Sequence, residues 1–166
     1  MDLSLLITGL GLGMGELVTV ARQADSAGFA GFYMAEVHRS GFVPLTAVAA
    51  ATQRMRIGPY VLNAYARSPL ITGMSAVDLN EVSGGRLVLG VGGGNRIINE
   101  VWQGIAHERV LTKMGDYIEI LRRVAATRVG ERVDFDGAVH RCHWSPVIDP
   151  GAQAFPIVLA AVFPSM

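Results

Sequence analysis

The chain has 166 residues, of which 51% are apolar and 17% charged, and its 14 basic and 14 acidic residues cancel. This composition is typical of a globular domain and excludes a disordered segment. It shows no basic stripe and no run of about 18 apolar residues, so we expect neither nucleic-acid nor membrane partners. Cys142 is the sole cysteine, which excludes an internal disulfide and fits a reducing cytoplasm, and Met1-Asp2-Leu3 lacks the basic start of a signal peptide.

Short apolar runs alternate with segments of helical spacing along most of the chain. The runs expected to form strands are Leu3–Leu10, Phe29–Val37, Arg56–Ala66, Arg86–Val91 and Phe155–Phe163. The segments expected to form helices are Glu16–Ala27, Pro44 to about Gln53, Ser68 to about Ser83, and about Leu111–Arg128. Such alternation predicts a parallel sheet, either open and doubly wound or closed into a barrel of eight strands and about 250 residues.

We expect a single domain over residues 1–166, with an excursion from the repeating pattern at about 96–150. Within the excursion, Asp136-Gly137 lies between extended flanks in Val133–Arg141, which is typical of a hairpin turn. The adjacent His140-Arg-Cys142-His143 has poor spacing for zinc ligands, so we expect no metal there.

Two glycine-rich loops follow predicted strands. They are Gly9-Leu-Gly-Leu-Gly-Met-Gly15 and Gly92-Gly93-Gly94. Each loop either lets a phosphate approach the backbone or simply forms a tight turn. Neither matches the dinucleotide-binding fingerprint, because other residue types stand where its third glycine is required. The pattern therefore argues against a Rossmann-type site.

Glu36 and His38 lie at the C-terminal end of the second predicted strand. In parallel barrels that end of each strand carries the chemistry, and a carboxylate and an imidazole there could position or protonate a redox substrate. A solvated pair of loop residues is the alternative on spacing alone. Arg86 opens the fourth strand, at the opposite end, where we expect a structural ion pair with Asp78 or Glu81 instead of catalysis.

Several blocks in family order, over nearly the whole chain, resemble the luciferase-like monooxygenase superfamily. The blocks are Arg56-Ile-Gly-Pro-Tyr-Val-Leu-Asn-Ala-Tyr-Ala-Arg-Ser-Pro69, Leu79-Asn-Glu-Val-Ser-Gly-Gly-Arg-Leu-Val-Leu-Gly-Val-Gly-Gly-Gly94, Met114-Gly-Asp-Tyr-Ile118, Phe135-Asp-Gly137 and Phe155-Pro-Ile-Val-Leu-Ala-Ala161. The third-strand block looks most like the branch that uses the deazaflavin coenzyme F420, which includes the methylene-tetrahydromethanopterin reductases. The resemblance implies the N-terminal half of a (β/α)8 TIM-type barrel, with hydride transfer at C5 of a deazaflavin ring seated at its C-terminal mouth.

The resemblance also implies the site residues. Glu36 and His38 would be catalytic, although in family members a histidine often directly follows the acidic residue, where this chain has Val37. The residues expected to bind the cofactor are Gly9, Gly11, Tyr60, Val61, Asn63, Gly92, Gly93, Gly94 and Asn95. The bond Tyr60–Val61 matches a non-prolyl cis peptide that forms a bulge behind the ring in this branch.

The implied function is that of an F420-dependent oxidoreductase acting on a small organic substrate. The alternatives are an FMN-dependent luciferase-like monooxygenase and a non-catalytic flavin-binding or assembly module. Because family members continue past the fifth strand, we expect this chain to be an N-terminal portion that is not a competent enzyme by itself. Its unpaired strand edges should promote association, so we also expect a homo-oligomer.

Overall fold

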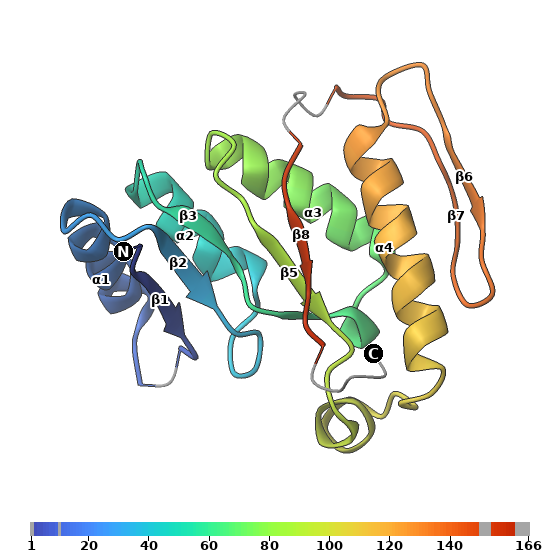
Figure 1. Cartoon of the computed structure of the whole chain (residues 1–166), viewed down its shortest axis with the longest axis horizontal. Coiled ribbons are helices and arrows are strands. Elements are labelled where there is room, and N and C mark those ends of the chain that lie inside the picture. The colour runs from blue at the N-terminus through green and yellow to red at the C-terminus, as the bar shows by residue number, and fades with distance from the viewer. Residues whose placement is uncertain (1, 10, 150–153, 162–166) are drawn as a thin grey trace. The chain divides into compact units, whose positions relative to one another are not determined.

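The structure is a computed structural model that describes residues 2–9, 11–149 and 154–161 (Figure 1). Strands and helices alternate from the N-terminus. In chain order the elements are β1 (Ser4–Ile7), α1 (Met14–Ser26), β2 (Gly31–Met34), α2 (Phe42–Ala51), β3 (Arg56–Pro59), β4 (Leu62–Asn63), the 3-10 helix η1 (Ala64–Ala66), α3 (Pro69–Val82), β5 (Leu89–Gly92), the π-helix η2 (Ile97–Val101), α4 (Val110–Ala126), β6 (Val133–Asp136), β7 (Arg141–Trp144) and β8 (Ile157–Leu159). No helix within the described ranges is long and apolar enough to cross a bilayer.

The chain divides into two compact units. The first comprises Met1–Leu62, Asp78–Val91 and Phe155–Leu159, and the second comprises Asn63–Val77, Gly92–Ala154 and Ala160–Met166. The first unit holds the parallel strands β1, β2, β3 and β8 and most of β5. The second unit holds η2, α4 and the strands β6 and β7.

The strands of the first unit are parallel and follow one another in chain order. β1 pairs with β2, and β2 pairs with β3. The series continues toward β5, because the N–H of Ile57 donates to the carbonyl of Arg86 (3.0 Å) and the N–H of Val88 donates to the carbonyl of Ile57 (2.8 Å). β5 in turn pairs with β8, beside which it runs in Figure 1. A doubly wound sheet reverses its strand order part-way, whereas this order runs in one direction.

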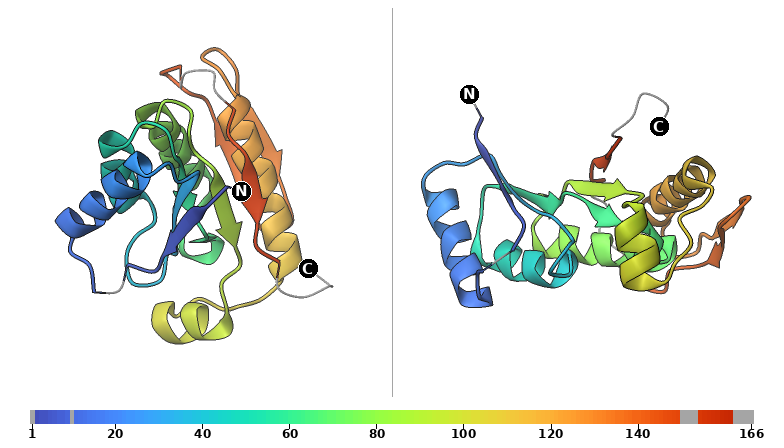
Figure 2. Two further views of the ribbon diagram at one scale, coloured as in Figure 1. Left: turned by 60° about the vertical axis from the view of Figure 1, so that its left-hand side comes forward. Right: turned by 90° about the horizontal axis from the view of Figure 1, so that it is seen from below.

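Helices α1 and α2 lie on one face of β1, β2 and β3 (Figure 2). The fully or nearly fully buried apolar side chains of these two helices and of β2 include Leu17, Ala21, Ala24, Phe32, Met34, Leu45, Val48 and Ala49. Tyr33 alternates with Phe32 and Met34 along β2 and is half buried on the opposite face. Sequential parallel strands with these helices on one face form the N-terminal half of a (β/α)8 TIM-type barrel, which confirms the predicted fold class. The described strands form no closed barrel.

Two glycines let β3 and β5 approach each other closely. A Cβ atom on Gly58 would overlap the carbonyl oxygen of Val88, and a Cβ atom on Gly90 would overlap that of Pro59. Both neighbours are backbone atoms, which cannot rotate away as a side chain can. The packing of the sheet therefore requires glycine at both positions.

The predicted third strand, Arg56–Ala66, is interrupted in the structure. β3 ends at Pro59, β4 covers only Leu62–Asn63, and η1 follows directly. The side chain of Asn63 accepts the N–H of Tyr65 at 3.0 Å and so caps this turn. The other predicted helices are present with ends displaced by one or two residues, and the other predicted strands with ends displaced by one to four residues. The predicted ends Leu10 and Phe163 lie outside the described residues.

Arg86 joins backbone segments of the first unit, but its partners are not the expected carboxylates. Its guanidinium donates to the carbonyls of Ala49 (2.9 Å), Thr52 (2.9 Å), Met55 (3.0 Å) and Ser83 (2.6 Å) and to the hydroxyl of Thr52 (3.0 Å). These bonds use all five of its N–H groups. The predicted ion pair with Asp78 or Glu81 is therefore wrong, because no donor is left for either carboxylate.

In the second unit, α4 packs against the hairpin of β6 and β7. Their shared core contains Ile120 and Val124 of α4, Val133 of β6 and Cys142 of β7. The strands are antiparallel, so the predicted hairpin is confirmed. Its turn is longer than predicted, because Asp136 still pairs with Arg141 and the connection spans residues 137–140.

The carboxylate of Asp116 on α4 holds this turn. Its Oδ2 accepts the N–H groups of Val139 (2.6 Å) and His140 (3.0 Å), and a Cβ atom on Gly137 would overlap the carboxylate. Burial acts to raise the pKa of Asp116, but these two N–H groups and the charges of His140 and Arg109 lower it by more, so the net shift is downward. The ionised carboxylate therefore stabilises the docking of the turn on α4.

Candidate functional site

Three predicted site residues follow the carboxyl ends of β1, β2 and β3 in the first unit. Gly9 follows β1, Glu36 follows β2 and Tyr60 follows β3. Because these strands are parallel neighbours, their carboxyl ends lie at the same edge of the sheet. The structure thus brings these three loops to one edge.

Glu36 lies at the N-terminal end of α2. Its Oε1 accepts the N–H of Gly41, the residue before α2, at 2.9 Å. Leu62, the residue before Asn63, packs over Gly41, since a Cβ atom there would overlap Cδ2 of Leu62. A helix N-terminus favours a negative charge, so the half-buried carboxylate is held in one orientation. His38, two residues farther along, is exposed.

Arg39 connects the loop after β2 to the glycine loop after β1. Its guanidinium donates to the carbonyl of Gly9 (3.5 Å) and to that of Leu12. Gly9 and Gly11 have φ angles of 76° and 75°, a left-handed conformation that favours glycine. Sequence analysis missed Arg39, because its partners are backbone carbonyls 30 and 27 residues earlier in the chain.

The peptide bond Tyr60–Val61 is cis, as the resemblance to the F420 branch implies. The ring of Tyr60 lies against that of Tyr33 on β2, with centroids 4.5 Å apart and planes inclined by 40°. Tyr33, Tyr60 and Val61 are all half buried. Burial, and then the neighbouring Tyr60, raise the pKa of Tyr33. The edge of the sheet therefore carries aromatic and apolar surface beside Glu36.

In the second unit, a chain of hydrogen bonds links Asn63, Asn99 and His107. Nδ2 of Asn63 donates to Oδ1 of Asn99 at 2.7 Å. Nδ2 of Asn99 lies 2.8 Å from the carbonyl oxygen of Gly93 and 2.7 Å from Nδ1 of His107. Asn99 lies on η2 and its exposed fraction is 0%. One buried amide thus joins the end of β4, the loop after β5 and the segment before α4.

The loop after β5 packs on this network. Gly94 has a φ angle of 64°, and a Cβ atom there would lie 3.1 Å from Oδ1 of both Asn63 and Asn99. Gly92 ends β5, and Gly93 is in contact with the network through its carbonyl. The side chain of Asn95 is exposed and accepts the N–H of Ile98 at 2.9 Å, near the start of η2. The structure therefore brings Asn63, Gly93 and Gly94 together, whereas Asn95 caps the neighbouring helical turn.

Tyr65 lies beside the same network. Its ring centroid is 5.1 Å from that of His107 and 3.7 Å from Nζ of Lys113, and its hydroxyl donates to the carbonyl of Glu108 at 2.5 Å. Burial lowers the pKa of Lys113 and, with the charge of Glu108, raises that of Tyr65. Sequence analysis missed Tyr65, Asn99, His107 and Lys113, because no motif connects residues so far apart in the chain.

His140, Cys142 and His143 do not converge. Cys142 is buried in the core of α4 and the hairpin, and the ring of His140 lies 5.7 Å from that of Tyr117. His143 is exposed, and its hydrogen bonds with Asp134 (2.8 Å) and Asp136 (3.3 Å) raise its pKa. Across residues 2–9, 11–149 and 154–161, no three His, Cys, Asp or Glu side chains are arranged to hold a metal.

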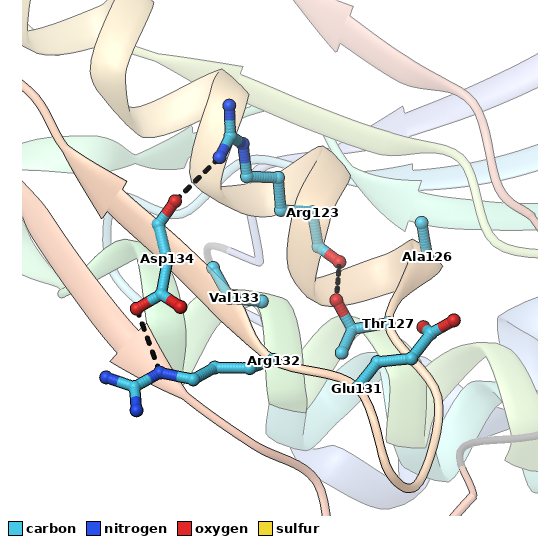
Figure 3. Close-up of a pocket in the computed structure, with 7 residues that line it drawn as sticks. All are labelled: Arg123, Ala126, Thr127, Glu131, Arg132, Val133 and Asp134. Atoms are coloured by element: carbon cyan, nitrogen blue, oxygen red, sulfur yellow. Dashed lines mark hydrogen bonds and ion pairs between the residues drawn. The ribbon is translucent and has the colours of Figure 1, made fainter.

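A pocket of about 460 Å³ lies between the C-terminal half of α4 and the start of β6 (Figure 3). Arg123 donates to the carbonyl of Asp134 at 2.7 Å, and Arg132 pairs with the carboxylate of Asp134 at 2.8 Å. The charges that line the pocket are therefore engaged with the protein itself. None of the predicted site residues lines it.

Comparisons with known proteins agree on one family. The profile of the family described as luciferase-like monooxygenase matches residues 7–166. The chain is 32% identical over 154 residues to the 5,10-methylenetetrahydromethanopterin reductase of Archaeoglobus fulgidus, covering 91% of this chain and 45% of that protein. It is 30% identical over 164 residues to the F420-dependent glucose-6-phosphate dehydrogenase of Nakamurella multipartita, covering 92% and 48%. The chain therefore spans about half the length of these curated relatives.

Solved structures share the fold at lower identity. The coenzyme F420 dependent tetrahydromethanopterin reductase from Methanopyrus kandleri has a TM-score of 0.79 and 20% identity, covering 99% of this chain and 51% of that one. The oxygenating constituent of 3,6-diketocamphane monooxygenase from Pseudomonas putida, in complex with FMN, has a TM-score of 0.81 and 18% identity, covering 96% and 51%.

Proposed function

Because this chain belongs to the luciferase-like monooxygenase family, we propose that the activity to which it contributes is that of an oxidoreductase that uses coenzyme F420. The proposed reaction is hydride transfer between the deazaflavin and a small organic substrate. The observation that carries the choice of cofactor is the 30% identity, over 92% of this chain, to a relative named for its dependence on F420. The FMN-bound structure is 18% identical, which supports a shared fold alone.

The side chains at the carboxyl edge of β1, β2 and β3 fit a flat ring. Tyr60 and Val61 are half buried, and Tyr33 lies against Tyr60, so this edge offers aromatic and apolar surface to a ring. Gly9 and Gly11 add no side chains that would obstruct the loop after β1. Glu36 supplies a carboxylate at the same edge. Apolar surface with a few oriented polar groups is typical of cofactor sites.

A bound deazaflavin would supply the hydride-transfer chemistry. In this proposal Glu36 is the acid–base residue, because its half-buried carboxylate is fixed through Oε1 by the N–H of Gly41 at 2.9 Å. His38, at the same end of β2, is exposed. Tyr60 and Val61 of the first unit would hold the ring.

Equilibrium dialysis of the purified chain against F420 and, separately, FMN tests this proposal. We expect F420 to bind at least about tenfold more tightly than FMN, a difference of about 1.4 kcal/mol. Tyr60→Ala should weaken F420 binding, whereas Glu119→Gln, which changes an exposed ion pair with Arg123 on α4, should not. Tighter binding of FMN, or retention of neither cofactor, would contradict the proposal.

A further inference from the structure

The hydrogen bonds around Asn99 run in one direction, and backbone groups at both ends fix that direction. The N–H of Tyr65 can only donate, so Asn63 accepts it with Oδ1 and donates with Nδ2 to Asn99. The carbonyl of Gly93 can only accept, so the nitrogen of Asn99 is the atom that faces it. The donor at Tyr65 and the acceptor at Gly93 thus require the same orientation of the Asn99 amide, with its Oδ1 toward Asn63.

His107 stands at the end of this chain of bonds. Nδ2 of Asn99 carries two hydrogens, of which one is donated to Gly93 and the other points to Nδ1 of His107 at 2.7 Å. Nδ1 must therefore present a lone pair, and the ring keeps its single proton on Nε2. We infer that Asn99 is a positioning residue that holds His107 as the neutral imidazole protonated on Nε2.

This arrangement makes Nε2 of His107 a donor available to a ligand. Among the described residues no protein group accepts the hydrogen on Nε2 of His107. The one buried side-chain nitrogen or oxygen without a hydrogen-bond partner among these residues is Nε2 of His140. Nε2 of His107 is therefore exposed to solvent and not buried. The ring is held by Tyr65, and the backbone N–H of His107 donates to Glu100 at 3.2 Å. The ligand group that fits is an acceptor oxygen of the cofactor or substrate. This ligand role rests on the proposed function, whereas the protonation of the ring does not.

Nitrogen NMR of the histidine-labelled chain tests the protonation directly. At neutral pH, Nδ1 of His107 should show the chemical shift of an unprotonated ring nitrogen, and Nε2 that of a protonated one. A wild-type spectrum with the proton on Nδ1 overturns the inference, whatever any variant does.

Asn99→Asp replaces the hydrogen-bond donor that faces Nδ1 of His107 with an acceptor. A carboxylate cannot donate, so the proton of His107 should move to Nδ1, where it can be donated to residue 99. Asn95→Asp is the matched control, because it makes the same change four residues earlier and keeps the acceptor for Ile98. An unchanged His107 in folded Asn99→Asp contradicts the inference. Should that variant fail to fold, Asn99→Ala decides: a mixture of both tautomers supports the inference, and the wild-type pattern contradicts it.

The ligand role is tested by His107→Phe, which keeps a ring beside Tyr65 and removes the donor. We expect F420 to bind about tenfold more weakly than to the wild-type chain, the effect of about one lost hydrogen bond. Equal binding overturns the ligand role. Failure of the wild-type chain to bind F420 overturns the ligand role together with the proposed function, and leaves the result on the tautomer standing.

Discussion

Gly94 can be compared with a second glycine of the same backbone conformation. Gly94 and Gly104 have φ angles of 64° and 66°, so alanine at either position meets the same left-handed strain of about 1–2 kcal/mol. At Gly94 the added Cβ also lies 3.1 Å from Oδ1 of Asn63 and of Asn99, whereas nothing lies within 4 Å at Gly104. We expect Gly94→Ala to lower the free energy of unfolding in urea by about 1–3 kcal/mol more than Gly104→Ala does. Equal losses would show that the asparagine pair moves aside.

Glu36→Gln tests the proposed role of the carboxylate in proton handling. The amide keeps an oxygen for the N–H of Gly41 but cannot exchange a proton. In a complete protein that contains this segment, we therefore expect turnover of F420 to fall about 10²–10⁴-fold while F420 binding changes little. His38→Ala should lower turnover in the same sense. Steady-state rates and binding constants measured side by side separate the two effects. Unchanged turnover in both variants would leave Glu36 and His38 as scaffold residues.

At the scale of single residues, the resemblance to the F420 branch identified more site residues than the spacing of residue types along the chain did. The third-strand block directed attention to Tyr60, Val61 and Asn63, and the structure has the implied cis bond between the first two. Asn99 and His107 lie in no block that resembles the family, so the sequence did not indicate a role for them. Asn99 bonds to Asn63, 36 positions away, so its role depends on a contact that only the folded chain creates.

At the scale of elements, the approach of β3 to β5 predicts a large effect at Gly58. Alanine there would overlap the carbonyl of Val88, so we expect Gly58→Ala to lower the free energy of unfolding by more than about 2 kcal/mol. Gly15→Ala is the control, because Gly15 lies in α1 with nothing within 4 Å, and should stabilise the chain by about 0.5–1 kcal/mol. Urea unfolding of both variants gives the comparison, and a mild effect at Gly58 would mean that the two strands separate easily.

The turn between β6 and β7 should loosen in acid. The pKa of Asp116 is lowered in the folded chain, so its contribution to stability is present above the pKa of the unfolded state and is lost as the pH falls through the folded value. The protection of the Val139 and His140 N–H groups against hydrogen exchange, relative to an unfolded chain at the same pH, should therefore fall over that acid range. Asp116→Ala should remove this pH dependence and destabilise the turn by about 1–3 kcal/mol. Asp78→Asn changes an exposed residue on α3 and should neither remove the pH dependence nor destabilise the turn.

The periodicity of apolar residues predicted most helices and strands. It failed where a side chain caps a turn inside a predicted strand. The spacing in Glu16–Ala27 and Leu111–Arg128 matches α1 and α4 closely, because each helix buries one continuous apolar face. The third strand was predicted to run unbroken, but Asn63 caps a 3-10 turn within it. η2 lies within the excursion at about 96–150 and was not predicted as an element, since a π-helical turn has no distinct periodicity in sequence.

At the scale of the molecule, the outer strands predict association. Among the described strands of the first unit, β1 and β8 each have one unpaired edge, and Leu6 and Leu159 are 62% and 44% exposed. Unpaired apolar strands favour contact between chains. We expect the apparent mass in light scattering to rise with concentration, and Leu6→Lys to reduce that rise. Val147→Lys, at a site 90% exposed in the second unit, should not. A monomer at all concentrations would contradict this prediction.

On the ribosome, the strands of the first unit become available in the order in which they pair. Ser4 meets Gly31, Gly31 meets Arg56, and Ile57 meets Leu87, so each strand finds its partner at the edge completed just before it. Leu89, by contrast, pairs with Ile157, which is synthesised only after α4 and the hairpin. During that interval α4 and the hairpin have time to form their own core. We therefore expect this sheet to grow from one side during translation, with β8 added only after α4 and the hairpin have been synthesised.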